Sequence, residues 1–142
     1  MTNTGKNQGE MAKARAMLDA QKARLQQVRD AIEEKKAEKL DLDLRHHKLE
    51  GTGDINKMMV LKSRSTALGK SIADLSSAEA EGLTRIRSLD RYLETLDRKS
   101  ESLRRESDSL SEKLAMEESF EVRAKLQTLI SRLKMQIDAL EG

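Results

Sequence analysis

The chain has 142 residues, a formal net charge of +2 and no Pro, Cys or Trp. Charged side chains make up 37% of it, against about 25% in a typical domain, and Tyr92 and Phe120 are its only aromatic residues. Aromatic rings normally supply much of the buried area of a compact core, so this composition argues against a layered globular domain. The balance of 27 basic and 25 acidic side chains also argues against a protein that coats nucleic acid, which usually needs a basic stripe.

Leu, Glu, Ala, Lys and Arg are, with Ser, the most abundant residues, and these five favour helices, as do the Met and Gln residues. Together with the high charge and the missing prolines, they predict an all-α protein built from long helices in a coiled coil. No apolar run approaches the roughly 20 residues that a membrane span needs, and the polar start lacks the apolar region of a signal peptide. We therefore expect a soluble protein of the cytoplasm, or of a virion if a phage encodes it.

The first predicted helix covers about residues 8–50, after a disordered start at residues 1–6. Asn7 and Glu10 have the spacing of a helix-capping pair. From Met11 onward, one helix face repeats with alternating steps of three and four residues, as in a heptad seam. Four of its members are polar. The seam comprises Met11, Ala14, Leu18, Gln21, Leu25, Val28, Ile32, Lys35, Lys39, Leu42, His46 and Leu49.

The clearest break in the chain lies at residues 51–54, with the sequence Gly-Thr-Gly-Asp. Gly51 can take the left-handed conformation that ends a helix, Gly53 adds freedom to the turn, and Asp54 is a good cap for the next helix. So short a connection between long helices predicts an antiparallel hairpin. Folding the chain back at residues 51–53 places Lys39 near Ser65, and Leu25 unfavourably near Glu79.

The second predicted helix covers about residues 55–115 and carries the strongest periodicity, because Leu recurs there at nearly every seventh residue. The first helix can cover this seam only up to about residue 97, so a second copy of the chain is expected to cover the remainder. The residues predicted to form an oligomer seam are Leu89, Leu96, Leu103, Leu110 and Leu114.

After residue 114 the apolar pattern changes phase. Residues 115–120 contain either a stutter in one continuous helix or a helix end, with Ser119 capping a C-terminal arm over about residues 120–141. Both alternatives remain open from the sequence, and both belong to a single elongated domain over residues 1–142. The arm's apolar residues are predicted to bind a partner, and these are Leu126, Ile130, Leu133 and Ile137.

Met58, Met59, Val60 and Leu61 form an apolar run directly after the turn. One helix face cannot bury all four against a single neighbour, and exposed apolar patches usually mark interfaces. Met is also a common adaptable contact residue. We therefore predict a partner-binding site at the tip of the hairpin.

The remaining motifs do not indicate chemistry. His46 and His47 are adjacent, so they point about 100° apart on a helix, and a zinc site needs at least three ligands. The glycine turn lacks the lysine of a phosphate loop. A coil of two helices offers no desolvated pocket in which a catalytic group could act. We expect no catalytic activity, no cofactor, no metal and no small-molecule substrate.

Two blocks of opposite charge lie along the second helix, basic over residues 84–105 and acidic over residues 106–121. They suit pairing between copies, although solvated faces would look the same. The sequence as a whole predicts a structural or assembly protein that self-associates as a spacer or scaffold. The alternative is an adaptor or regulator that docks by its hairpin tip or C-terminal arm on an enzyme or a nucleic-acid machine.

Overall fold

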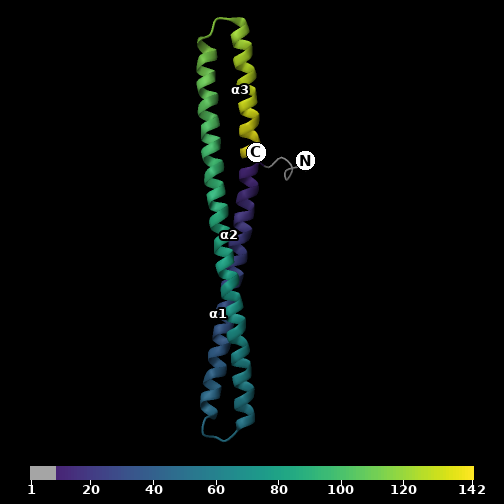
Figure 1. Ribbon diagram of the computed structural model, residues 1–142, viewed down its shortest axis with the longest axis vertical. Helices are drawn as coiled ribbons and strands as arrows, with labels where there is room; N and C mark the ends of the chain where they lie inside the picture. Colours follow the sequence, from purple (N-terminus) through teal and green to yellow (C-terminus); the bar gives the residue numbers. More distant parts are fainter. Residues whose placement is uncertain (1–8) are drawn as a thin grey trace. The chain divides into compact units, whose positions relative to one another are not determined.

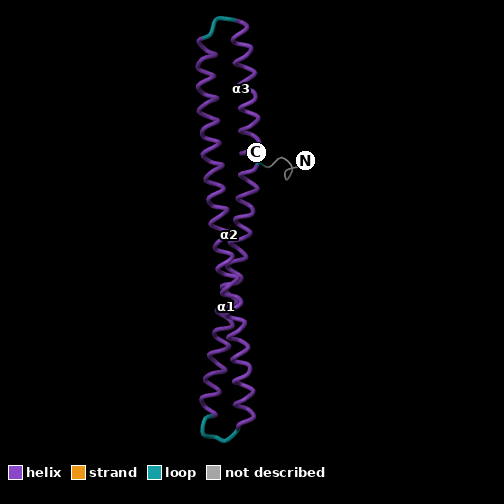
Figure 2. Tube along the Cα trace, viewed as in Figure 1, coloured by secondary structure: helices purple, strands orange, loops and turns teal. Residues whose placement is uncertain are grey.

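The computed structural model describes residues 9–142, which form three helices and no strand. The helices are α1 (Glu10–Leu49), α2 (Ile55–Met116) and α3 (Phe120–Glu141), and short turns join them (Figure 1; Figure 2). The predictions of an all-α fold, of a hairpin between the first two helices and of a C-terminal helix are confirmed. The expected disordered start and the Asn7 cap lie outside the described residues.

The chain divides into two compact units. The first hairpin unit consists of residues 20–86, which include the end of α1 and the start of α2. The second hairpin unit consists of residues 87–142 together with the start of the chain up to Asp19. It therefore contains the first turns of α1, the second half of α2 and all of α3.

In the first hairpin unit, the helix faces turned toward each other are the predicted seams. Leu25 and Ile32 are buried at 8% and 5% exposure, and Ser65 is buried at 4%. The other predicted seam positions are at least half-buried, even where the residue is polar, as at Gln21, Lys35 and Lys39 of α1. Long polar side chains can occupy such positions because their stems pack while their ends reach water.

The predicted register of this hairpin is wrong by about one helical turn. Asp43 rather than Lys39 contacts Ser65, and the two side chains share a hydrogen bond of 2.5 Å. Glu79 pairs with Arg29 at 3.0 Å instead of facing Leu25. The expected unfavourable contact between Leu25 and a carboxylate is thereby avoided.

The shift in register has a geometric cause. Side chains on an α-helix tilt toward its amino end, so in an antiparallel pair the two sets tilt in opposite directions. The side chains that meet therefore lie further along α2 than their Cα positions suggest. This tilt amounts to about one residue on each helix and accounts for about half of the observed shift.

The turn of the first hairpin unit satisfies the helix ends with local groups. Gly51 and Gly53 have φ angles of 81° and 80°, in the left-handed region where a side chain would be strained. The Thr52 amide donates to the Leu49 carbonyl at 3.0 Å. The Asp54 carboxylate accepts the Lys57 amide at 3.2 Å, which caps the start of α2.

In the second hairpin unit, α3 runs antiparallel to the second half of α2 (Figure 1). Leu140 of α3 and Met11 and Ala14 of α1 form one buried cluster with Leu96 of α2. Leu93 and Leu103 pack against this cluster. Thus α2 is covered here by two helices, one from each end of the chain.

The end of α3 meets the start of α1 within this unit (Figure 1). A Cβ atom added to Gly9 would lie 2.3 Å from the amide nitrogen of Gly142 and 2.6 Å from the carbonyl oxygen of Leu140. No side chain fits at that separation, so the close approach of the two backbones requires glycine at position 9.

The second turn contains neither Gly nor Pro, and charged side chains hold it instead. The Glu117 carboxylate accepts the amides of Glu118 and Ser119 at 3.1 and 3.0 Å, at the start of α3. The Arg123 guanidinium donates to the carbonyls of Leu114 and Glu117 at 3.1 and 3.0 Å, at the end of α2. Of the two alternatives open from the sequence, the helix end is therefore observed.

Replacing Gly82 by Ala should stabilise the protein. A Cβ atom at this position would lie 3.5 Å from Cδ1 of Leu25, an ordinary contact distance, and Ala is better than Gly in a helix by about 1 kcal/mol. Urea unfolding followed by circular dichroism should show a gain of about that size. The control Gly53→Ala should lose stability, because its φ is positive. A loss in Gly82→Ala would mean that α1 and α2 approach more closely than described.

Replacing Arg123 by Gln should destabilise the second turn, because two carbonyl oxygens at the end of α2 lose their charged donor. The expected loss is about 1 kcal/mol, in view of the exposure of the site. Arg132→Gln is the matched control, since Arg132 is exposed on the same helix. Equal urea midpoints for the two variants would contradict the capping role of Arg123.

Candidate interaction surfaces

Only half of the apolar run after the first turn is covered. Met58 and Leu61 are half-buried in the seam of α2. Met59 and Val60 are 65% and 51% exposed, and neighbouring Ile55 is 65% exposed. These three side chains give the start of α2 an apolar outer surface.

Leu40 and Leu44 add to the exposed apolar surface near this turn, with exposures of 61% and 52%. They lie four residues apart on α1 and therefore share one face of the helix. The sequence analysis did not single them out. Their spacing away from the seam was the signal that could have identified them.

Two open depressions flank the first turn. One has apolar walls from Ile55, Met58, Met59 and Ala67, and its other lining residues are Lys62, Ser63, Thr66 and Lys70 of α2 and His46 of α1. The other lies between the two helices and is lined by Leu49, Asn56, Lys57, Val60 and Leu61. Both combine apolar walls with a lysine.

We call residues 44–63 the basic tip, because Lys and Arg outnumber Asp and Glu there. Its basic residues are Arg45, Lys48, Lys57 and Lys62, and its acidic residues are Glu50 and Asp54. His46 and His47 both face Glu50, with nitrogen–oxygen distances of 3.8 and 3.1 Å. Among residues 9–142, no group of three His, Asp or Glu side chains is placed to hold a metal ion.

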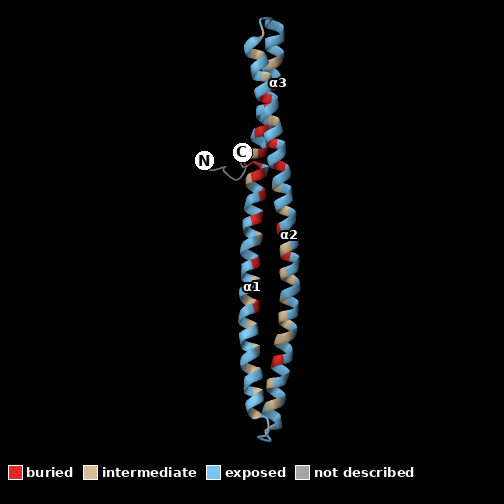
Figure 3. Ribbon diagram, turned by 90° about the vertical axis from the view of Figure 1, so that its left-hand side faces the viewer, coloured by how far each residue is buried: buried red, intermediate tan, exposed pale blue. Residues whose placement is uncertain are grey.

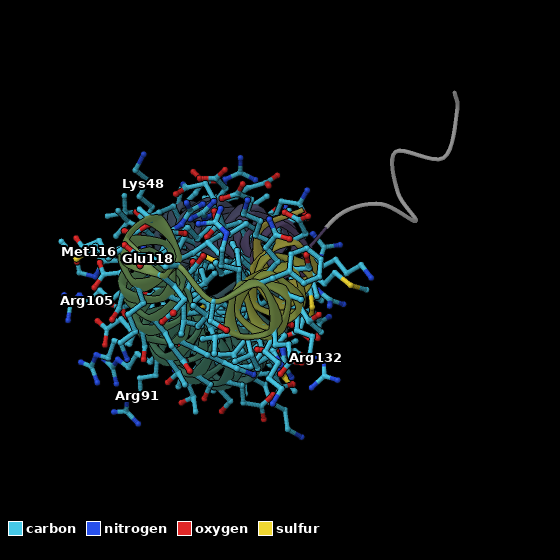
Figure 4. The ribbon with its side chains drawn as sticks, turned by 90° about the horizontal axis from the view of Figure 1, so that it is seen from above. Lys48, Arg91, Arg105, Met116, Glu118 and Arg132 are labelled. Carbon is cyan, nitrogen blue, oxygen red and sulfur yellow. The ribbon has the colours of Figure 1, made fainter. Side chains whose placement is uncertain are left out.

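The turn between α2 and α3 carries a second exposed apolar pair. Met116 is 87% exposed and Phe120 is 85% exposed, and Figure 4 shows the Met116 side chain extending away from the helices. We call residues 112–122 the acidic tip, because four acidic residues lie there beside one basic residue, Lys113. The acidic residues are Glu112, Glu117, Glu118 and Glu121.

The sequence predicts a break in the helix and an acidic block in this region, but not the exposed apolar surface. Its signal was the chain's single Phe at a turn, outside both seams and among carboxylates. Figure 3 shows that the residues around both turns are mostly exposed or intermediate, and that the buried residues lie away from the turns along the helices.

The residues predicted to bind partners through the C-terminal arm lie instead on the covered face of α3. Ile130, Leu133 and Ile137 are buried at 7–8% exposure, and Leu126 is half-buried. A partner would reach them only if α3 separated from α2. Their role in partner binding stays a prediction.

The residues predicted to form an oligomer seam are likewise covered within one chain. Leu96 is buried at 5% exposure, and the others, Leu89, Leu103, Leu110 and Leu114, are half-buried. The seam beyond residue 97 therefore finds cover from α3 without a second copy. Pairing of copies along this seam stays a prediction.

A group of three polar side chains fastens the end of α3 to α2. The Glu141 carboxylate accepts hydrogen bonds from the Arg104 guanidinium, with one nitrogen at 3.0 Å, and from the Ser100 hydroxyl. The bonds from Arg104 and then from Ser100 lower the pKa of Glu141 below its ordinary value of 4.5. The same pairing raises the pKa of Arg104.

Asp43 and Ser65 form a similar link between α1 and α2 in the first hairpin unit. The hydrogen bond from Ser65, followed by that from Lys39, lowers the pKa of Asp43. Each resolved pKa shift among residues 9–142 thus has a hydrogen bond between two helices as its largest cause. The shifts reflect how the helices are fastened together.

No family model, curated protein or solved structure matches this chain. None of the helices within residues 9–142 is both long and apolar enough to cross a bilayer. We therefore infer the function from the exposed surfaces at the basic tip and the acidic tip.

Stability should fall in acid partly through Glu141. Because its pKa is lower in the folded state, its contribution is complete above the ordinary value of 4.5 and is lost as the pH falls through the folded value. Thermal unfolding of the wild type and of Glu141→Gln should differ at neutral pH. The difference should shrink once Glu141 is protonated, and a constant difference at all pH values would contradict this role.

Proposed function

We propose that the chain is a non-enzymatic coiled-coil assembly protein that self-associates and serves as a spacer or scaffold. The observation that carries the proposal is the placement of its exposed apolar side chains. Of the twelve large ones among residues 9–142, seven lie within five residues of a helix end at one of the two turns, and these are Leu44, Ile55, Met59, Val60, Met116, Phe120 and Val122. Contiguous exposed patches of this kind usually mark protein interfaces.

The non-enzymatic part of the proposal rests on the charged groups. A catalytic acid or base is usually perturbed by burial in a concave site. The shifted groups described here, Asp43, Arg104 and Glu141, are instead engaged in bonds between helices. The depressions near the first turn are open to solvent, and their linings consist mainly of apolar, lysine and small polar side chains and contain no carboxylate.

An adaptor that docks on another protein by the basic tip is the second candidate. The depression lined by Ile55, Met58 and Met59 favours it, because Met-rich apolar surfaces adapt to varied partners. The two candidates differ in what covers the tip, which is another copy in the first case and a different protein in the second. A setting in the cytoplasm or in a virion remains a prediction.

Sedimentation equilibrium of the purified full chain tests the proposal. We expect the average mass to rise with concentration above the 16.0 kDa of one chain. A mass that stays at that of the monomer up to about 1 mM, where even weak association becomes visible, would contradict self-association and leave the adaptor as the better candidate.

A further inference from the structure

The basic tip and the acidic tip are complementary in charge. Each presents exposed large apolar side chains, Ile55, Met59 and Val60 in the first case and Met116 and Phe120 in the second. Lysines border the first group, and glutamates border the second. The two tips therefore both present apolar side chains and carry opposite net charges.

The two surfaces also differ in shape. One open depression, with apolar walls from Leu49, Val60 and Leu61, lies within the basic tip. The other begins in the basic tip at Ile55, Met58 and Met59 and extends along α2 to Lys70. The acidic tip offers side chains that extend into solvent, since Met116 and Phe120 are 87% and 85% exposed. A projecting aromatic ring next to a small apolar hollow is a common arrangement at the centre of interfaces.

Resting on the proposed self-association, we propose that the acidic tip of one copy docks on the basic tip of a second copy. Met116 and Phe120 then pack against the apolar surface at the start of α2, and the surrounding glutamates face Lys57 and Lys62. Contacts between two identical tips are disfavoured, because each would bring charges of the same sign together. Charge thus selects unlike tips as partners.

This pairing is heterologous, because each copy uses two different surfaces. Such contacts close into a ring if the rotation between copies permits, and otherwise continue as an open chain of subunits. Stable interfaces usually bury at least about 1,000 Å². A contact between two inter-helix turns buries less surface than a contact along the length of two helices. The association should therefore be weak, concentration-dependent and sensitive to salt.

Reversing the charge of one tip at a time tests the proposal in the full chain. Lys57→Glu with Lys62→Glu makes both tips acidic, whereas Glu112→Lys with Glu118→Lys makes both tips basic. Sedimentation velocity should show that each double variant loses self-association by at least about tenfold in affinity, close to 1.4 kcal/mol. An equimolar mixture of the two variants should recover it, since unlike tips are present again.

The apolar part of the contact has its own control. Phe120→Ser should weaken association, whereas Met135→Ser should not, although Met135 is also 72% exposed on α3. Circular dichroism should show the same helix content for all variants. High salt should reduce association of the wild type, because the charges that select the tips are exposed.

Two results would overturn the proposal, and they have different meanings. Association that survives both charge reversals refutes docking between the tips but leaves the self-associating scaffold intact, with the interface elsewhere. A wild type that remains monomeric throughout the concentration series refutes both the tip contact and the proposed function.

Discussion

The apolar stripe along α2 is the feature on which the rest of the structure depends. It is the longest seam in the chain, and no single helix covers it. In the first hairpin unit the stripe packs against α1, and in the second it packs against α3 and the first turns of α1. With so few aromatic residues, the fold obtains its burial from many small contacts along helices, each involving Leu, Ile, Met or Ala.

Polar residues within the seam select the register where the apolar contacts alone would allow helices to slide. Ser65 bonds to Asp43 and Ser100 bonds to Glu141, and both serines are buried at 4–6% exposure. Buried polar residues in coiled coils commonly specify register at some cost in stability. Sliding α1 by one turn would separate Asp43 from its partner and bring Leu25 toward the carboxylate of Glu79.

Much of the architecture could be predicted from the sequence, because heptad spacing and turn residues act locally. The helix bounds near residues 50, 55 and 120 followed from Gly51, Asp54 and the phase change after Leu114. The register could not be predicted to within a turn, since it depends on side-chain tilt and on which polar side chain of α1 meets the buried Ser65. The return of α3 was only one of two alternatives, because Glu117 and Arg123 hold a turn that lacks glycine. The apolar surface of the acidic tip was not predicted, because the exposure of Met116 and Phe120 depends on how the turn between α2 and α3 is built.

The junction at Gly9 has a consequence for how the second hairpin unit comes apart. At this junction the carboxyl end of α3 lies against the amino end of α1, next to Leu96 and Ser100 of α2. The dipoles of α3 and α1 are aligned head to tail at this junction, and Leu140, Met11 and Ala14 pack together on Leu96 of α2. Separating this end of α3 from α2 would expose Leu140 and break the bonds of Glu141. Residues 120–129 contain no buried side chain, so α3 should fray from its amino end before its carboxyl end separates.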